Sequence, residues 1–142
     1  MPIHDEETLA MLRLSMCEGV GDEAIHKLVE HFGSARQVLD MPSDDLQQIH
    51  GVGPTLAERI QAGPATDRFE EEIELMERAS TSLLRFTEDA YPLPLQHIGN
   101  AAPPLLRVRG DYKRRDMLSV GVVGSRNATH YGRSQARRFG MA

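Results

Sequence analysis

The stretch LSMCEGVGDEAIHKL, residues 14–28, decides the fold of the first half of this chain. A second stretch, LQQIHGVGPTLAERI at residues 46–60, repeats it at an offset of 32 residues. In both copies, apolar residues lead into a Gly-Val-Gly turn and recur after it at helical spacing, which predicts two helical hairpins. Each turn has two glycines that permit positive φ and a close approach of backbone. These glycines are Gly19 and Gly21 in the first copy and Gly51 and Gly53 in the second.

The repeat resembles the helix-hairpin-helix motif, and its two copies resemble the tandem, SAM-like version found in small all-helical DNA-associated domains. We therefore expect an all-α tandem helix-hairpin-helix domain over residues 1–66. Turns of this kind can hold duplex phosphates through their backbone amides, without reading bases. Binding of duplex or junction DNA is thus one interpretation of this half of the chain.

The charge of this half favours a different role. Residues 1–66 contain four Lys and Arg against eleven Asp and Glu, a net charge of −7. The first turn is flanked by Glu18 and Glu23, whose carboxylates would repel a phosphate, whereas the second has His50 and Arg59 nearby. We favour a structural or protein-docking role, because each hairpin needs the other to bury its apolar face. DNA binding by the turns is kept as the alternative.

A connector, QAGPAT at residues 61–66, separates this domain from an amphipathic segment at residues 67–79. In that segment Phe69, Ile73 and Met76 fall on one face of a predicted helix, and glutamates form a solvated face.

After this helix the spacing of apolar residues changes from a helical to a strand-like pattern. Three later runs read as strands: SLLRFT at 82–87, PLLRVRG at 104–110 and MLSVGVVG at 117–124. The last is apolar enough for a central parallel strand, and HYGRSQARRFG at 130–140 reads as the helix after it. Residues 67–142 therefore predict the start of an α/β, doubly wound, Rossmann-like domain.

The segment between this strand and helix has the features of a phosphate-binding loop. Backbone amides after Gly124 can face outward, and the following helix adds the positive end of its dipole. Arg126 can make paired hydrogen bonds to a phosphate. The loop lacks both G-x-G-x-x-G and G-K-[ST], which argues against a dinucleotide or nucleoside-triphosphate site. The predicted phosphate ligands are Gly124, Ser125, Arg126, Asn127 and Thr129. A plain strand-to-helix turn with a solvated arginine is the alternative.

The surroundings of the loop favour nucleic acid. Residues 100–142 contain nine Lys and Arg against two Asp and Glu, a net charge of +7, so a polyanion should meet this part of the chain. We predict supporting contacts from Arg133 and Arg137. Tyr131 could stack on an unpaired base or pack at the start of the helix.

Essentially the whole chain also resembles the DNA-processing protein A family (DprA, also called Smf), and residues 91–132 are the specific part of this resemblance. The motifs that carry the resemblance are Tyr91-Pro92, Pro103-Pro104-Leu105 before Gly110-Asp111, the loop Gly124-Ser125-Arg126, and Tyr131-Gly132. The resemblance implies single-stranded DNA binding by the glycine-serine-arginine loop of an extended Rossmann domain. It further implies loading of the RecA recombinase onto incoming DNA during natural transformation, and self-association.

Members of that family continue well beyond the equivalent of Ala142, so we expect this chain to be an N-terminal fragment of a longer parent. The RecA contact and self-association are then properties of the parent. We also expect residues beyond about 100 to be poorly protected or to self-associate, because a final strand with an unpaired edge is exposed.

Composition excludes several other classes. The lone Cys17 rules out an internal disulfide framework and a cysteine-based zinc site, and six histidines lack ligand spacing, so we expect no metal or cofactor. The acidic N-terminus and the absence of an apolar run of about 20 residues predict a cytoplasmic protein without a membrane partner.

The remaining alternative is a nucleotide-handling enzyme on a Rossmann scaffold, such as a phosphoribohydrolase-like protein. Such an enzyme needs a carboxylate near the phosphate loop. Asp111 and Asp116 are the acids nearest in sequence, and both precede the predicted strand, away from its C-terminal end. We therefore expect a non-enzymatic protein with no catalytic residues.

Overall fold

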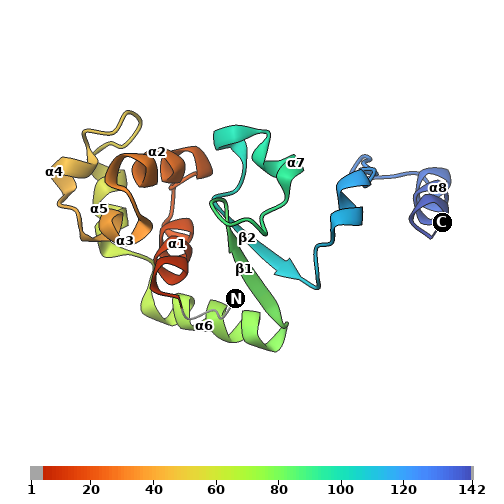
Figure 1. Cartoon of the computed structure of the whole chain (residues 1–142), viewed down its shortest axis with the longest axis horizontal. Coiled ribbons are helices and arrows are strands. Elements are labelled where there is room, and N and C mark those ends of the chain that lie inside the picture. The colour runs from red at the N-terminus through yellow and green to blue at the C-terminus, as the bar shows by residue number, and fades with distance from the viewer. Residues whose placement is uncertain (1–4, 142) are drawn as a thin grey trace. The chain divides into compact units, whose positions relative to one another are not determined.

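The computed structural model describes residues 5–141 and forms two compact units, one ending at Tyr112 and one beginning at Lys113. The first unit consists of helices followed by a small antiparallel sheet (Figure 1). The second contains a short 3-10 helix, an irregular stretch and a longer helix. No helix within residues 5–141 is both long and apolar enough to cross a membrane.

The first unit begins with the two predicted hairpins. Its opening helices are α1 (Glu6–Met16), α2 (Asp22–Phe32), α3 (Ala35–Asp40), α4 (Ser43–Leu46) and α5 (Pro54–Ala62). Helices α1 and α2 flank the first Gly-Val-Gly turn, α4 and α5 flank the second, and α3 lies between the hairpins in sequence. The predicted all-α tandem is therefore confirmed.

Local capping sets the ends of these helices. The Asp5 carboxylate accepts a hydrogen bond from the backbone N–H of Thr8 at 3.2 Å at the start of α1, and the Ser34 hydroxyl accepts one from that of Gln37 at 3.1 Å at the start of α3. Gly33 ends α2 with φ of +92°, a left-handed conformation that favours glycine.

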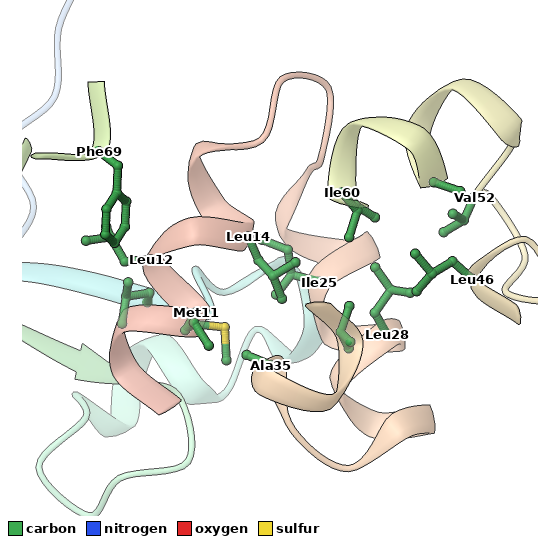
Figure 2. Close-up of a cluster of buried hydrophobic side chains, with 14 of the residues drawn as sticks. Met11, Leu12, Leu14, Ile25, Leu28, Ala35, Leu46, Val52, Ile60 and Phe69 are labelled. Carbon is green, nitrogen blue, oxygen red and sulfur yellow. The ribbon is translucent and has the colours of Figure 1, made fainter. Parts of the chain in front are cut away.

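One apolar core joins the hairpins. The largest fully buried side chains are Leu12, Leu14, Ile25, Leu28, Val38, Leu46, Ile60 and Leu83. Figure 2 shows Leu14 and Ile25 of the first hairpin close together, with Leu46 of the second directed toward Leu28. Burial of one such side chain stabilises a fold by roughly 1.5–3 kcal/mol, so neither hairpin could leave this face in water. The tertiary contact between the repeats is thus what makes each one stable.

The same core continues beyond the helical tandem. Helix α6 (Thr66–Arg78) buries Phe69 and Met76, as the sequence predicts, and Leu83 of strand β1 (Thr81–Arg85) lies in the same cluster. In Figure 2, Phe69 lies beside Leu12 of α1. The first compact unit therefore includes residues on both sides of the boundary predicted after residue 66.

Strand β1 pairs with β2 (Leu105–Arg109), so the first two predicted strands are confirmed. The pairing is antiparallel, with Thr81 opposite Arg109 and Arg85 opposite Leu105, rather than the parallel arrangement of a doubly wound sheet. The connection between the strands contains the short helices α7 (Leu93–Gln96) and η1 (Gly99–Ala101).

The third predicted strand, at residues 117–124, is absent from the structure. The 3-10 helix η2 (Arg114–Leu118) covers its start, and residues 119–125 have no regular secondary structure. Val120 is 86% exposed and Val123 is 95% exposed. An apolar central strand needs hydrogen-bonding neighbours along both edges, and residues 5–141 place none beside it. A Rossmann-like, doubly wound sheet is therefore not confirmed.

The second unit ends in helix α8 (His130–Gly140), which agrees with the helix predicted at residues 130–140.

Candidate nucleic-acid interface

The two Gly-Val-Gly turns have the same backbone geometry. The first glycine of each is left-handed, with φ of +83° at Gly19 and +95° at Gly51. The second glycine of each, Gly21 or Gly53, has extended φ and caps the following helix without a side-chain hydrogen bond. The N-terminal amides of α2 and α5 are thus not capped by these residues, as a backbone-amide contact to phosphate would require.

The guanidinium of Arg59, expected from the sequence near the second turn, makes its contacts at the first turn instead. Its guanidinium Nη1 donates a hydrogen bond to the Glu18 carbonyl oxygen at 3.2 Å, and its Nη2 lies 4.0 Å from the Glu18 carboxylate. The arginine of the second hairpin therefore contacts the turn of the first. Its charge is partly offset there by Glu18, which weakens the predicted advantage of the second turn for phosphate.

The predicted phosphate loop lies in the second unit and is open to solvent. Residues 121–127 are all exposed, and Arg126 and Asn127 form a turn. Thr129 caps α8, because its hydroxyl oxygen accepts a hydrogen bond from the N–H of Gly132 at 3.1 Å. The Thr129 hydroxyl keeps its own hydrogen for a further acceptor.

Part of the predicted site borders one hollow of about 590 Å³ in the second unit. Its lining includes Gly124, Ser125 and Thr129 from the loop, together with Arg133 from α8. Apolar side chains also line it: Val122, Val123, Ala128, Ala136 and Phe139. Arg126 and Asn127 stand outside this hollow, on the exposed turn.

A second groove, of about 420 Å³, follows α8 and is lined by His130, Arg133, Ser134 and Arg137. The two arginines were predicted from the sequence as DNA contacts, whereas His130 and Ser134 were not. Their spacing of i, i+3, i+4 and i+7 is the signal that could have found them, since it puts all four side chains on one helix face. Tyr131 is 73% exposed, so packing at the helix start does not cover its ring.

The two units differ sharply in charge. Residues 113–142 contain seven Lys and Arg and one acid, Asp116, whereas residues 1–112 contain nine Lys and Arg and twenty Asp and Glu. The Asp116 carboxylate accepts a hydrogen bond from the N–H of Lys113 at 2.6 Å and lies 3.9 Å from the Arg115 guanidinium. The single acid of this unit is thus engaged at η2, and the loop and α8 carry an uncompensated positive charge.

The tyrosine and proline motifs have a structural role in the first unit. The Tyr91 hydroxyl donates to the Pro103 carbonyl oxygen at 2.7 Å, and its ring packs edge-on against Phe86 with centroids 5.4 Å apart. Burial raises the pKa of Tyr91, and the charge of Asp22 adds to the shift, so the phenol stays neutral and able to donate. These residues hold the connection between β1 and β2 in place.

Within residues 5–141, no group of three or more His, Cys, Asp or Glu side chains is arranged to hold a metal ion. Cys17 is buried, which raises the pKa of its thiol.

A tandem of glycine hairpins followed in sequence by a basic, glycine-containing loop is typical of DNA-associated proteins. Comparison with known families agrees: residues 82–142 match the family described as DNA recombination-mediator protein A, and residues 11–63 match the SAM-like helix-hairpin-helix tandem. The chain thus contains a segment similar to the DNA recombination-mediator protein A family, preceded by a helix-hairpin-helix tandem. The resemblance, whose specific part is residues 91–132, is confirmed by these two matches. No curated protein and no solved structure matches the chain.

Proposed function

We propose that this protein is a non-enzymatic recombination mediator that binds single-stranded DNA through the loop Gly124–Thr129. The observation that carries the proposal is an exposed glycine-containing loop in a unit with seven basic residues and one acid. Basic side chains that outnumber the acids of their unit attract a ligand with several negative charges, so the expected ligand is a polyanion.

The chemistry of the loop suits a sugar-phosphate backbone. Exposed amides at Ser125 to Asn127, the Arg126 guanidinium and the Thr129 hydroxyl are all donors. Arginine adds a planar pair of donors that matches two phosphate oxygens. Contacts to phosphate carry no direct information on the base sequence, so binding through these donors should be largely independent of sequence.

A single strand is favoured over a duplex by the exposed ring of Tyr131 beside the loop. Unpaired bases stack on aromatic rings, and such stacking contributes about 1–3 kcal/mol per base. The apolar hollow next to the loop offers a second surface for a base. The family supports a role in recombination, and by resemblance we extend this to natural transformation in the cytoplasm. RecA loading and self-association are proposed for a longer parent.

The test is binding of fluorescent polythymidylate by anisotropy across a salt series. Arg126→Ala should weaken binding and reduce the slope of log K against log salt by about 0.7, the value for one phosphate contact to a single strand. Arg115→Ala is the matched control, because Arg115 is an exposed arginine of the same unit beside Asp116. An unchanged slope for Arg126→Ala would remove the loop from the proposal. Tighter binding of a mononucleotide than of the oligonucleotide would favour the nucleotide-handling enzyme.

The second candidate function is duplex or junction binding by the hairpin turns, favoured by their shared geometry and uncapped helix starts. Gly53→Asp tests it. Aspartate is a good N-cap, φ at Gly53 is −86°, and a Cβ there meets no atom within 4 Å, so the fold should tolerate it. The added carboxylate would repel phosphate from the α5 amides. A loss of duplex affinity in this variant, with Arg126→Ala unaffected, would establish the hairpin mode.

A further inference from the structure

Two hollows of the first compact unit adjoin at the connection between α5 and α6. One, of about 480 Å³, is lined by residues of α1, α3 and α5. The other, of about 360 Å³, is lined by the ends of α1 and α5 and the start of α6. Ala62 and Gly63 line both, so we treat the two hollows as one surface, the connector groove. Its arginines and its half-buried leucines are Leu9, Arg13, Arg36, Leu39, Arg59 and Arg68.

The connector groove collects the basic residues of an acidic region. Residues 1–78 contain six Lys and Arg and seventeen Asp and Glu. Four of the six basic residues line the groove. Only three of the seventeen acids do so, namely Glu6, Glu18 and Asp40. The groove is therefore a local positive site in an acidic region, and a cleft concentrates the field of the charges that line it.

Contacts within the unit hold two of the arginines at the groove without using up their donors. The Arg13 guanidinium carbon lies 4.4 Å from the centre of the Phe69 ring. Arg59 donates one hydrogen bond, from Nη1 to the Glu18 carbonyl oxygen, and the Glu18 carboxylate is 4.0 Å from Nη2, beyond hydrogen-bond distance. Since a guanidinium has five N–H donors, both arginines keep donors for a ligand.

The other two arginines are exposed. Arg36 pairs with the Glu6 carboxylate, and both side chains are largely in water. Such exposed pairs contribute little to stability, so a carboxylate of a ligand can replace Glu6. Arg68 forms no ion pair among residues 5–141. All four guanidinium groups are thus able to meet an anionic ligand.

The groove also presents carbon surface. Leu9 and Leu39 line its larger hollow, and both are half-buried against the core. An inorganic anion would leave this surface in water, whereas a ligand with an apolar side chain would cover it. Among the described residues, no aromatic side chain lines either hollow, so the groove offers no ring on which a base could stack.

We propose that the connector groove binds an acidic, amphipathic peptide segment of a partner protein. Carboxylates of the peptide pair with the arginines, and an aliphatic side chain packs on Leu9 and Leu39. A short peptide meets only the groove, whereas the phosphates of a long strand would continue over the many acids outside it and be repelled. This activity is separate from strand binding at the loop Gly124–Thr129 and does not depend on it.

The test uses the full chain and a fluorescent synthetic peptide in which two central leucines are flanked by glutamates. In one control peptide glutamines replace the glutamates, and in the other serines replace the leucines. Binding is measured by anisotropy for the unmodified chain, Arg68→Gln and Arg78→Gln. Both arginines are exposed on α6, but Arg78 pairs with Glu74 and lines neither hollow. Circular dichroism checks that both variants keep their helices.

We expect the acidic leucine peptide to bind with an affinity that falls as salt rises, because the charges involved are exposed. Each control peptide should bind at least about tenfold more weakly, since it lacks either the charges or the apolar anchor. Arg68→Gln should weaken binding of the acidic leucine peptide about threefold, as loss of one exposed charge pair should, and Arg78→Gln should change it less.

Three outcomes would overturn the proposal. Equal effects of Arg68→Gln and Arg78→Gln, or equal binding of the serine peptide, would show diffuse attraction to positive charge. Displacement of the peptide by polythymidylate or a DNA duplex from the Arg126→Ala variant would assign the groove to nucleic acid. A dimer of the unmodified chain that Arg68→Gln converts to a monomer, measured by sedimentation, would assign the groove to a second copy of this chain. Strand binding at the loop is unaffected by the first and third outcomes.

Discussion

His26 Nε2 lies 2.8 Å from the carbonyl oxygen of Ala102, a residue 76 positions away along the chain. Because a carbonyl oxygen only accepts, the imidazole donates from Nε2. The same ring packs edge-on against Phe86, with centroids 4.8 Å apart. Helix α2 of the first hairpin is thereby joined to the connection between β1 and β2. This contact links the helix-hairpin-helix tandem to the segment that carries the recombination-mediator family match.

Replacement of this histidine should loosen that link. His26→Ala removes the hydrogen bond and the aromatic contact, so we expect a loss of about 1–2 kcal/mol in the free energy of unfolding, measured with urea. His31→Ala is the matched control, since His31 contacts Phe32 edge-on but is exposed. Its effect should stay below about 0.5 kcal/mol. Equal effects would show that His26 adds nothing through Ala102.

The glycine turns allow a test of backbone geometry. Gly19→Ala and Gly51→Ala place a Cβ on residues with φ of +83° and +95°, so each should cost about 1–2 kcal/mol of stability. Gly19→Ala should cost slightly more, because its Cβ would lie 3.1 Å from Arg59 Nη1. Gly21 and Gly53 have extended φ and open space around the position of a Cβ. Gly21→Ala and Gly53→Ala should therefore each cost only about 0.5 kcal/mol of stability. Thermal or chemical unfolding measures these costs, and a different order among the four variants would contradict the prediction.

Acid should weaken the start of α1. The Thr8 hydroxyl donates to the Asp5 carboxylate at 2.9 Å and lowers the pKa of Asp5, with smaller contributions from the Thr8 N–H and from Arg85 at 3.3 Å. A lowered pKa in the folded state gives stability that is complete above the unfolded pKa, about 3.9, and is lost as the pH falls through the folded value.

The Asp5→Asn variant isolates this effect. At neutral pH it should be less stable than the unmodified chain. The difference should begin to shrink near pH 4, the unfolded pKa, and should vanish once the pH is below the folded pKa of Asp5. Urea unfolding over a pH series measures the difference. A gap that stays constant down to low pH would mean that the Asp5 charge does not contribute.

Amide exchange should separate the paired strands from the predicted third strand. Residues 120–125 make no backbone hydrogen bond within the described part of the chain, and they are exposed. We expect fast exchange there and slower exchange at Leu83 and Leu84, which lie in the ladder with β2. Strong protection throughout 120–125 would show that this segment pairs as a strand in solution, with another chain or otherwise.

Sequence patterns predicted the helices and the two short strands well, because the signals that start and end them lie within a few residues. The amphipathic spacing of Phe69, Ile73 and Met76 predicted α6, and both Gly-Val-Gly turns were recognised from their glycines. The loop at 124–129 was located from its residue types alone. The grouping of His130 and Ser134 with the arginines was missed, although helical spacing carries that information.

The sequence by itself determined where the hairpins turn, which faces of the helices are apolar and where positive charge collects. These features depend on φ preferences, capping and composition, all of which are local. Only the tertiary structure decided that Arg59 contacts Glu18, that His26 reaches Ala102 and that residues 119–125 are not a strand. The two contacts depend on a residue that is distant along the chain, and a strand at 119–125 would need a neighbouring strand. Local sequence patterns do not encode which distant groups meet.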